Sequence, residues 1–128
     1  MAFQYSVTVR NAKLDQIETT IGVSAVLKVF SGAEPANCAA ADPTGLLVTI
    51  TLPVDWMANA ATGAKSKLGT WSGTASATGT AASWRIYELT GATCGIQGNT
   101  TDMTFDNTSI ASGQTVTVNT FTITAANS

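Results

Sequence analysis

Apolar residues near the start of the chain recur at the spacing of an α-helix. They are separated by three, four or seven positions, and the set is Phe3, Val7, Leu14, Ile17 and Ile21. The polar residues between them are expected on the solvent side, and they are Arg10, Asn11, Lys13, Asp15 and Glu18. Ser6 can cap the first turn, and Gly22 can end the last one. The pattern predicts an amphipathic helix from Ser6 to Ile21. Its apolar stripe either covers one end of the same domain or docks on a neighbouring subunit.

After Gly22 the pattern changes to short apolar runs of strand type, bounded by turn residues. The runs lie at 24–30, 46–53, 83–89 and 102–107, and a closing run begins at Gln114. Turns are expected at 90–95 and 109–113, a Pro- and Gly-rich loop at 31–45, and a short helical turn at 54–60. The stretch 62–83 is rich in Gly, Ala, Ser and Thr. It is either a mobile arm or a hairpin that becomes ordered against something else.

The closing run contains a change of register. Val116 and Val118 occupy even positions, whereas Phe121 and Ile123 occupy odd ones. Because the side-chain period of a strand is two, this change predicts a bulge near residues 119–120. The four apolar side chains are then expected to line one core, with the threonines outside. The bend would carry the strand from one sheet to the other.

Short strands with frequent turns predict an antiparallel β-sandwich, of jelly-roll or immunoglobulin-like type, with one N-terminal helix. A parallel sheet would need crossover helices, and the pattern contains a single convincing one. We expect the helix to occupy residues 1–22 and the sandwich to occupy residues 23–128.

Composition narrows the classes of partner. Only 11% of the residues are charged and the formal net charge is −2, whereas about 25% charged is typical. Phosphate recognition needs a clustered positive field, so we expect no nucleic-acid partner. No signal-peptide core and no apolar run of about 18 residues is present. We therefore expect no membrane partner, and assembly in a cytoplasm.

Candidate catalytic chemistry is sparse. The chain has no histidine, the usual general base and metal ligand. Asp102 and Asp106 share a strand face but would lie about 13 Å apart, which favours solvated surface acids. Cys38 and Cys94 do not form a metal-binding spacing. They are either two free thiols or one bridge formed after release into an oxidising medium. We expect no enzyme activity, no cofactor and no metal.

The three tryptophans are the remaining candidates for binding. Trp84 lies in an apolar strand and is expected in the core, and Trp56 is expected to plug one end of it. Trp71 stands alone among Gly, Ser and Thr. It is interpreted as an anchor into a partner's pocket, an exposed sugar platform, or ordinary core packing.

Three segments carry a resemblance to a known family: "VRNAKLDQIETTIG", "SWRIYE" and "DMTFDNTSIASGQTVTVNTFTIT". Together they resemble small structural proteins of tailed bacteriophages. The resemblance implies a virion component, most concretely a capsid decoration (cement) protein that stabilises the head by bridging capsid subunits. Its partners would be the major capsid protein or other virion proteins, and it would form a homo-oligomer on the particle. The alternative is a neck- or tail-associated structural protein, or a host-recognition module that binds a carbohydrate or receptor, with Trp71 or Trp56 as its platform. The expected partner-binding residues are Phe3, Val7, Leu14, Ile17, Ile21 and Trp71.

Overall fold

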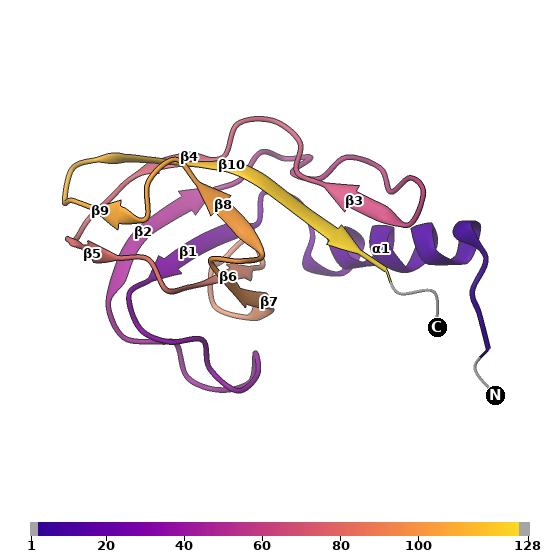
Figure 1. The fold of residues 1–128 in the computed structure, drawn as a ribbon, viewed down its shortest axis with the longest axis horizontal. Coiled ribbons are helices and arrows are strands. Elements are labelled where there is room, and N and C mark those ends of the chain that lie inside the picture. Colours follow the sequence, from indigo (N-terminus) through magenta and orange to yellow (C-terminus); the bar gives the residue numbers. More distant parts are fainter. Residues whose placement is uncertain (1–2, 126–128) are drawn as a thin grey trace.

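The structure, a computed structural model, describes residues 3–125. The first two residues of the expected helical segment (1–2) and the last three of the expected sandwich (126–128) lie outside this range. The structure is mainly β, with antiparallel sheets and one N-terminal helix, which confirms the predicted fold class (Figure 1). The helix α1 spans Val7–Ile21, one residue shorter than expected. The strands are β1 Val26–Phe30, β2 Leu46–Thr51, β3 Ala64–Ser66, β4 Ser72–Thr74, β5 Gly79–Thr80, β6 Ser83–Tyr87, β7 Cys94–Asn99, β8 Met103–Phe105, β9 Ser109–Ile110 and β10 Thr115–Thr124.

Two larger sheets form the sandwich. The first has the order β2-β1-β6-β7. In the second, β10 pairs with β3, β4 and β8. An isolated bridge between Val48 and Ala75 joins the two sheets along one side, and β5 pairs with β9 as a small separate ribbon.

The aromatic residues fill the space between the sheets. Trp56, Trp71 and Trp84 are each at most 1% exposed. Ring centroids lie 6.1 Å apart for Trp56 and Trp71, 5.8 Å for Trp71 and Phe121, and 5.1 Å for Trp84 and Phe121. The core positions expected for Trp56 and Trp84 are confirmed. The alternatives that exposed Trp71 are wrong, because the ring is 0% exposed and packs against Trp56 and Phe121.

Strand β10 explains the change of register in the sequence. Its pairing with β8 shifts between Val118 and Thr120, so the predicted bulge is confirmed. The shift keeps Val116, Val118 and Phe121 buried while Ile123 is half-buried. The predicted crossing between sheets is wrong, however. β10 stays in the second sheet and extends past the sandwich to pair with β3.

The expected local elements mostly form. Residues 54–60 are one exception, because they adopt bends and a bridge rather than a helical turn. The stretch 62–83 is ordered against the chain itself, since β3 and β4 pair with β10 and β5 pairs with β9. The two expected turns contain strand residues, because β7 begins at Cys94 and β9 occupies Ser109–Ile110.

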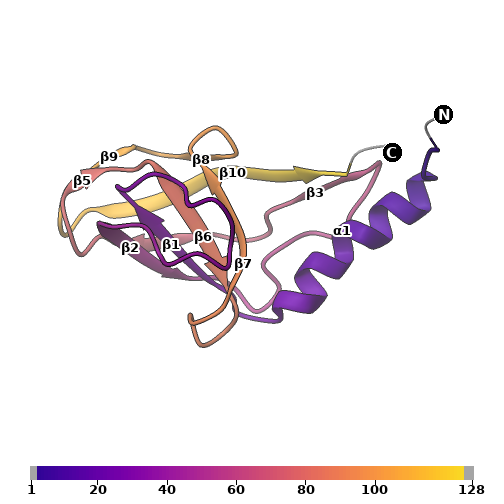
Figure 2. The ribbon, with the colours of Figure 1, turned by 90° about the horizontal axis from the view of Figure 1, so that it is seen from below.

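Helix α1, strand β3 and the end of β10 form an arm beside the sandwich. In Figure 2 the helix diverges from the strands of the first sheet toward its N-terminus, while β3 and the end of β10 run beside it. The first helical turns therefore lie beyond the main core. This arm, defined here by α1, β3 and residues 122–125, positions the candidate site.

Candidate functional site

The caps of α1 fix where the arm begins and where it meets the sandwich. The Ser6 hydroxyl accepts a hydrogen bond from the Val9 N–H at 3.2 Å, which satisfies one donor of the first turn. Gly22 ends the helix with φ 95°, and its N–H donates to the Glu18 carbonyl. The indole of Trp56 donates to the Gly22 carbonyl at 2.9 Å. The end of the helix is thus tied directly to the aromatic core.

Polar side chains hold α1 against the rest of the arm. The guanidinium of Arg10 donates to the Ala125 carbonyl, at 3.1 and 3.2 Å. The Asn11 side chain accepts from the Gly63 N–H at 2.9 Å. Asp15 accepts from the Ala60 N–H at 2.9 Å, and Glu18 accepts from the Met57 N–H at 3.1 Å. The expectation that Arg10, Asn11, Asp15 and Glu18 face solvent is therefore wrong. They satisfy backbone donors and acceptors of loops that no strand covers.

Lys65 is the charge at the centre of this contact. Its ammonium lies 2.7 Å from Asp15 Oδ1 and 3.1 Å from Glu18 Oε1, and its side chain is 1% exposed. Burial alone would lower the pKa of Lys65, but hydrogen bonds with both carboxylates raise it on balance. The Lys65 hydrogen bond, with that of the Ala60 N–H, lowers the pKa of Asp15. The two carboxylates lie three residues apart on one helix face. They thus form ion pairs with a buried lysine, which the hydrophobic pattern of the sequence did not indicate.

Because the polar side docks, part of the apolar stripe is left uncovered. Phe3 is 64% exposed and Val7 is 48% exposed. Leu14, about two turns further along the helix than Val7, is buried at 3%. Val7 begins the helix and Phe3 lies in the segment before it, at the end of the arm that projects beyond the sandwich (Figure 2).

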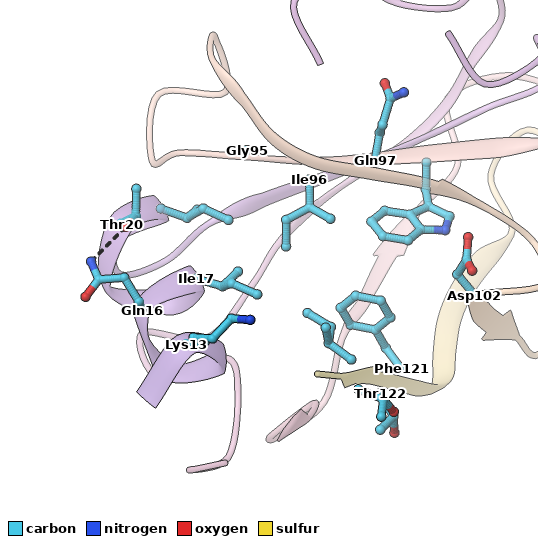
Figure 3. Close-up of a pocket in the computed structure, with 14 residues that line it drawn as sticks. Lys13, Gln16, Ile17, Thr20, Gly95, Ile96, Gln97, Asp102, Phe121 and Thr122 are labelled. Atoms are coloured by element: carbon cyan, nitrogen blue, oxygen red, sulfur yellow. Dashed lines mark hydrogen bonds between the residues drawn. The ribbon is translucent and has the colours of Figure 1, made fainter. Parts of the chain in front are cut away.

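The other flank of α1 borders a groove of about 700 Å³ between the helix and the open side of the sandwich. Figure 3 shows Ile17 of α1, Ile96 of β7 and Phe121 of β10 pointing into the same space, with Lys13 reaching in from the helix. The remaining lining residues are Gln16, Thr20, Ile21, Trp84, Gly95, Gln97, Asp102, Thr122, Ile123 and Thr124. The inner surface is therefore mainly apolar, and its polar groups lie around the rim.

Two strand edges flank this groove. β7 is the last strand of its sheet, and the register of β10 with β8 ends at Phe121. At one end of the groove the helix closes onto β7, because a Cβ on Gly95 would lie 2.6 Å from Ile21 Cγ1. Only glycine gives the helix end this close approach without displacement of Ile21. The groove thus combines apolar side chains with backbone groups at two sheet edges.

The structure brings only part of the expected partner-binding set together. Ile17 and Ile21 line the groove, and Phe3 and Val7 lie on the projecting end of the arm. Leu14 is enclosed within the arm, and Trp71 is 0% exposed. Trp71 cannot be an anchor or a sugar platform in this fold, because its ring is packed between Trp56 and Phe121 and its indole N–H donates to the Leu68 carbonyl. Leu14 contributes to folding rather than to an accessible surface.

Ile96 and Phe121 were missing from the expected site. Strand alternation identifies Phe121 as a core residue. The neighbouring sequence contains no signal that distinguishes a core ring from one that also borders a groove. Within residues 3–125 no cluster of three metal-ligating side chains is present. No helix in that range has the length and apolarity to span a bilayer.

No family model, curated protein or solved structure matches this chain.

Proposed function

We propose that the chain is a structural component of a tailed-bacteriophage virion, most concretely a decoration protein that binds the capsid exterior and bridges capsid subunits. One observation carries this proposal. The helix is held by its polar side, so Phe3 and Val7 remain exposed and Ile17 and Ile21 border an open groove. Apolar surface left uncovered in this way is typical of a site for another protein.

The segments that resemble phage structural proteins support the same interpretation. The first forms α1 with its docking residues, the second forms β6, and the third forms β8 to β10. These elements build the arm and its attachment to the sandwich. The resemblance therefore covers part of the groove lining, whereas β7, which supplies Gly95, Ile96 and Gln97, lies outside it.

The low charge of the surface also favours dense packing. With a net charge of −2, neighbouring copies repel one another weakly. Outward threonines of β10 make hydroxyl contacts with adjacent strands, as between Ser66 and Thr122 at 3.1 Å. Such a surface loses little hydration energy when it is covered.

The mechanism would be mechanical. Pressure from packaged DNA loads the shell, and a subunit that contacts several capsid subunits raises the energy needed to separate them. A standard interface of roughly 1,600 Å² per contact suffices, and repetition over the shell adds avidity.

The abundance of the chain in purified phage particles tests the proposal. Quantitative mass spectrometry against the major capsid protein is expected to find hundreds of copies per particle. A few tens would favour a neck or tail location, and absence from the particles would end the proposal.

A matched pair of variants tests the docking surface. Truncation of Phe3 and Val7 to alanine is expected to weaken particle binding about tenfold without a change in melting temperature. The control is Leu89→Ala, because Leu89 is similarly exposed, at 59%, but lies on the turn between β6 and β7 and not on the projecting end of the arm. Equal binding by both variants would show that the arm is not the contact.

The host-recognition alternative now has no observation in its favour. It depended on Trp56 or Trp71 as a platform, and both rings are fully buried.

A further inference from the structure

Two cysteines that are 56 residues apart meet at the edge of the first sheet. Cys94 begins β7, and Cys38 lies in the 31–45 loop between β1 and β2. Both are free and half-buried, and the Cys94 thiol donates a hydrogen bond to Cys38 Sγ at 2.8 Å. A disulfide requires about 2.05 Å between the sulfur atoms, so a displacement of under about 1 Å would suffice.

The surrounding contacts hold the loop in this position before any bond forms. Arg85 donates to the Asn37 carbonyl at 3.0 Å, to the Ala40 carbonyl at 3.1 Å and to Asp42 Oδ1 at 2.9 Å. Arg85 is 2% exposed, although its strand pattern gave no reason to expect a buried cation. Gln97 of β7 donates to the Pro35 carbonyl at 2.7 Å. The backbone on both sides of Cys38 is therefore fixed against the sheet.

We propose that Cys38 and Cys94 form an intramolecular disulfide when the protein leaves a reducing compartment, and that this bond locks the 31–45 loop onto β7. The inference rests on contacts within the chain and does not depend on the virion role. Its oxidant is a small-molecule disulfide. In a cytoplasm, thiol buffers keep the pair reduced.

The reaction proceeds by two exchanges. The Cys38 thiolate attacks the small disulfide, forms a mixed disulfide and releases one small thiolate. Cys94 then loses its proton, attacks Cys38 Sγ and releases the second small thiolate. The protein loses two electrons and two protons, and the oxidant becomes two thiols.

The order of attack follows from the environment of Cys94. Burial and the hydrogen bond with Cys38 raise the pKa of Cys94 to about 12, so its thiol is a poor nucleophile at neutral pH. Cys38 therefore reacts with the oxidant first, and Cys94 resolves the adduct.

The test uses the full chain, purified under reducing conditions and then incubated with oxidised glutathione. Intact mass is expected to fall by two hydrogen atoms with no retained glutathione, and both thiols should disappear from a thiol titration. The melting temperature should rise by about 10 °C, since the bond closes a long loop in the unfolded chain. Two free thiols at equilibrium, stable adducts or a bond between chains would overturn the proposal. A disulfide without higher thermal stability would refute the lock.

Single variants test the order of attack. Cys94→Ser should accumulate one glutathione adduct on Cys38 rapidly, whereas Cys38→Ser should form an adduct on Cys94 more slowly. The opposite order would refute the assigned roles. Neither variant should show the oxidant-dependent rise in melting temperature, and a rise in either would refute the Cys38–Cys94 bond as its cause.

Discussion

The buried ammonium of Lys65 gives an asymmetric prediction for the two sides of its ion cluster. The lysine side chain is 1% exposed, whereas Asp15 is 46% exposed and Glu18 is 20% exposed. Removing both acids leaves an unpaired cation in the protein, and breaking a buried pair in this way costs about 3 kcal/mol or more. Removing the lysine leaves carboxylates that water can still reach, so we expect a smaller loss, of about 1–2 kcal/mol.

The variants that separate these cases are Asp15→Asn with Glu18→Gln, Lys65→Met, and the three changes combined. We expect the acid-side variant to melt about 10 °C below the parent chain, Lys65→Met to fall less, and the combined variant to recover much of the loss. Lys13→Met is the control, because Lys13 is an exposed lysine on the same helix. Chemical denaturation gives the free energies, and hydrogen exchange of α1 amides shows whether the arm detaches first. If the acid-side variant lost no more than Lys65→Met, the assignment of Lys65 as the desolvated partner would be refuted.

The same cluster predicts a pH window. Because the pKa of Asp15 is lowered in the folded state, its contribution to the unfolding free energy is fully present above its unfolded pKa, near 3.9. This contribution is lost as the pH falls through the folded-state pKa. Because the pKa of Lys65 is raised in the folded state, its contribution to the unfolding free energy is fully present below its unfolded pKa, about 10.4. This contribution is lost as the pH rises through the folded-state pKa. The difference in unfolding free energy between the parent and the combined variant should therefore be nearly constant from about pH 5 to 9. A difference that grew outside this window would contradict the reasoning.

Two substitutions and one titration probe the sandwich. Trp71→Ala should lower the unfolding free energy by about 3–5 kcal/mol in a denaturation experiment; a loss below about 1 kcal/mol would contradict its core position. Gly98→Ala should cost about 1–3 kcal/mol, because its Cβ would lie 2.5 Å from the Trp84 ring and 2.6 Å from Asp102 Oδ2; unchanged stability would contradict this contact. The Glu88 carboxylate should titrate near pH 2 by NMR, since the Thr90 hydroxyl and three backbone N–H groups of its turn lower its pKa to about 2; a midpoint near 4 would contradict these hydrogen bonds.

Much of the β architecture could be predicted from local pattern. Compact apolar runs bounded by turn residues located β1 and β2, side-chain alternation located β6 and β8, and the parity change at Val118–Phe121 located the bulge. The bulge could be predicted because β10 has one buried face, which imposes a period of two on its side chains. β1 could be predicted as a continuous apolar run because it is buried on both faces. The helix ends were also predictable, because Ser6 and Gly22 satisfy local backbone requirements.

The arm could not be predicted in the same way. Helical spacing identified the apolar stripe, but docking was decided by hydrogen bonds between Asn11, Asp15 or Glu18 and backbone groups of loops far along the chain. Trp71 was misjudged for a related reason: its neighbours in sequence are small, and its packing partners come from other segments. Contacts between distant segments leave no periodic signal, so the groove and the cysteine contact emerged only from the structure.

Strand β10 determines when folding can finish. All three of its partners, β3, β4 and β8, are synthesised before it, so the second sheet lacks its central member until Thr124 has left the ribosome. The first sheet can form earlier, from β1, β2, β6 and β7. Until then, a nascent chain could form only the first sheet, and β3, β4 and β8 would remain unpaired with β10. Translation arrested before residue 115 would therefore yield an aggregation-prone intermediate rather than a shorter working domain.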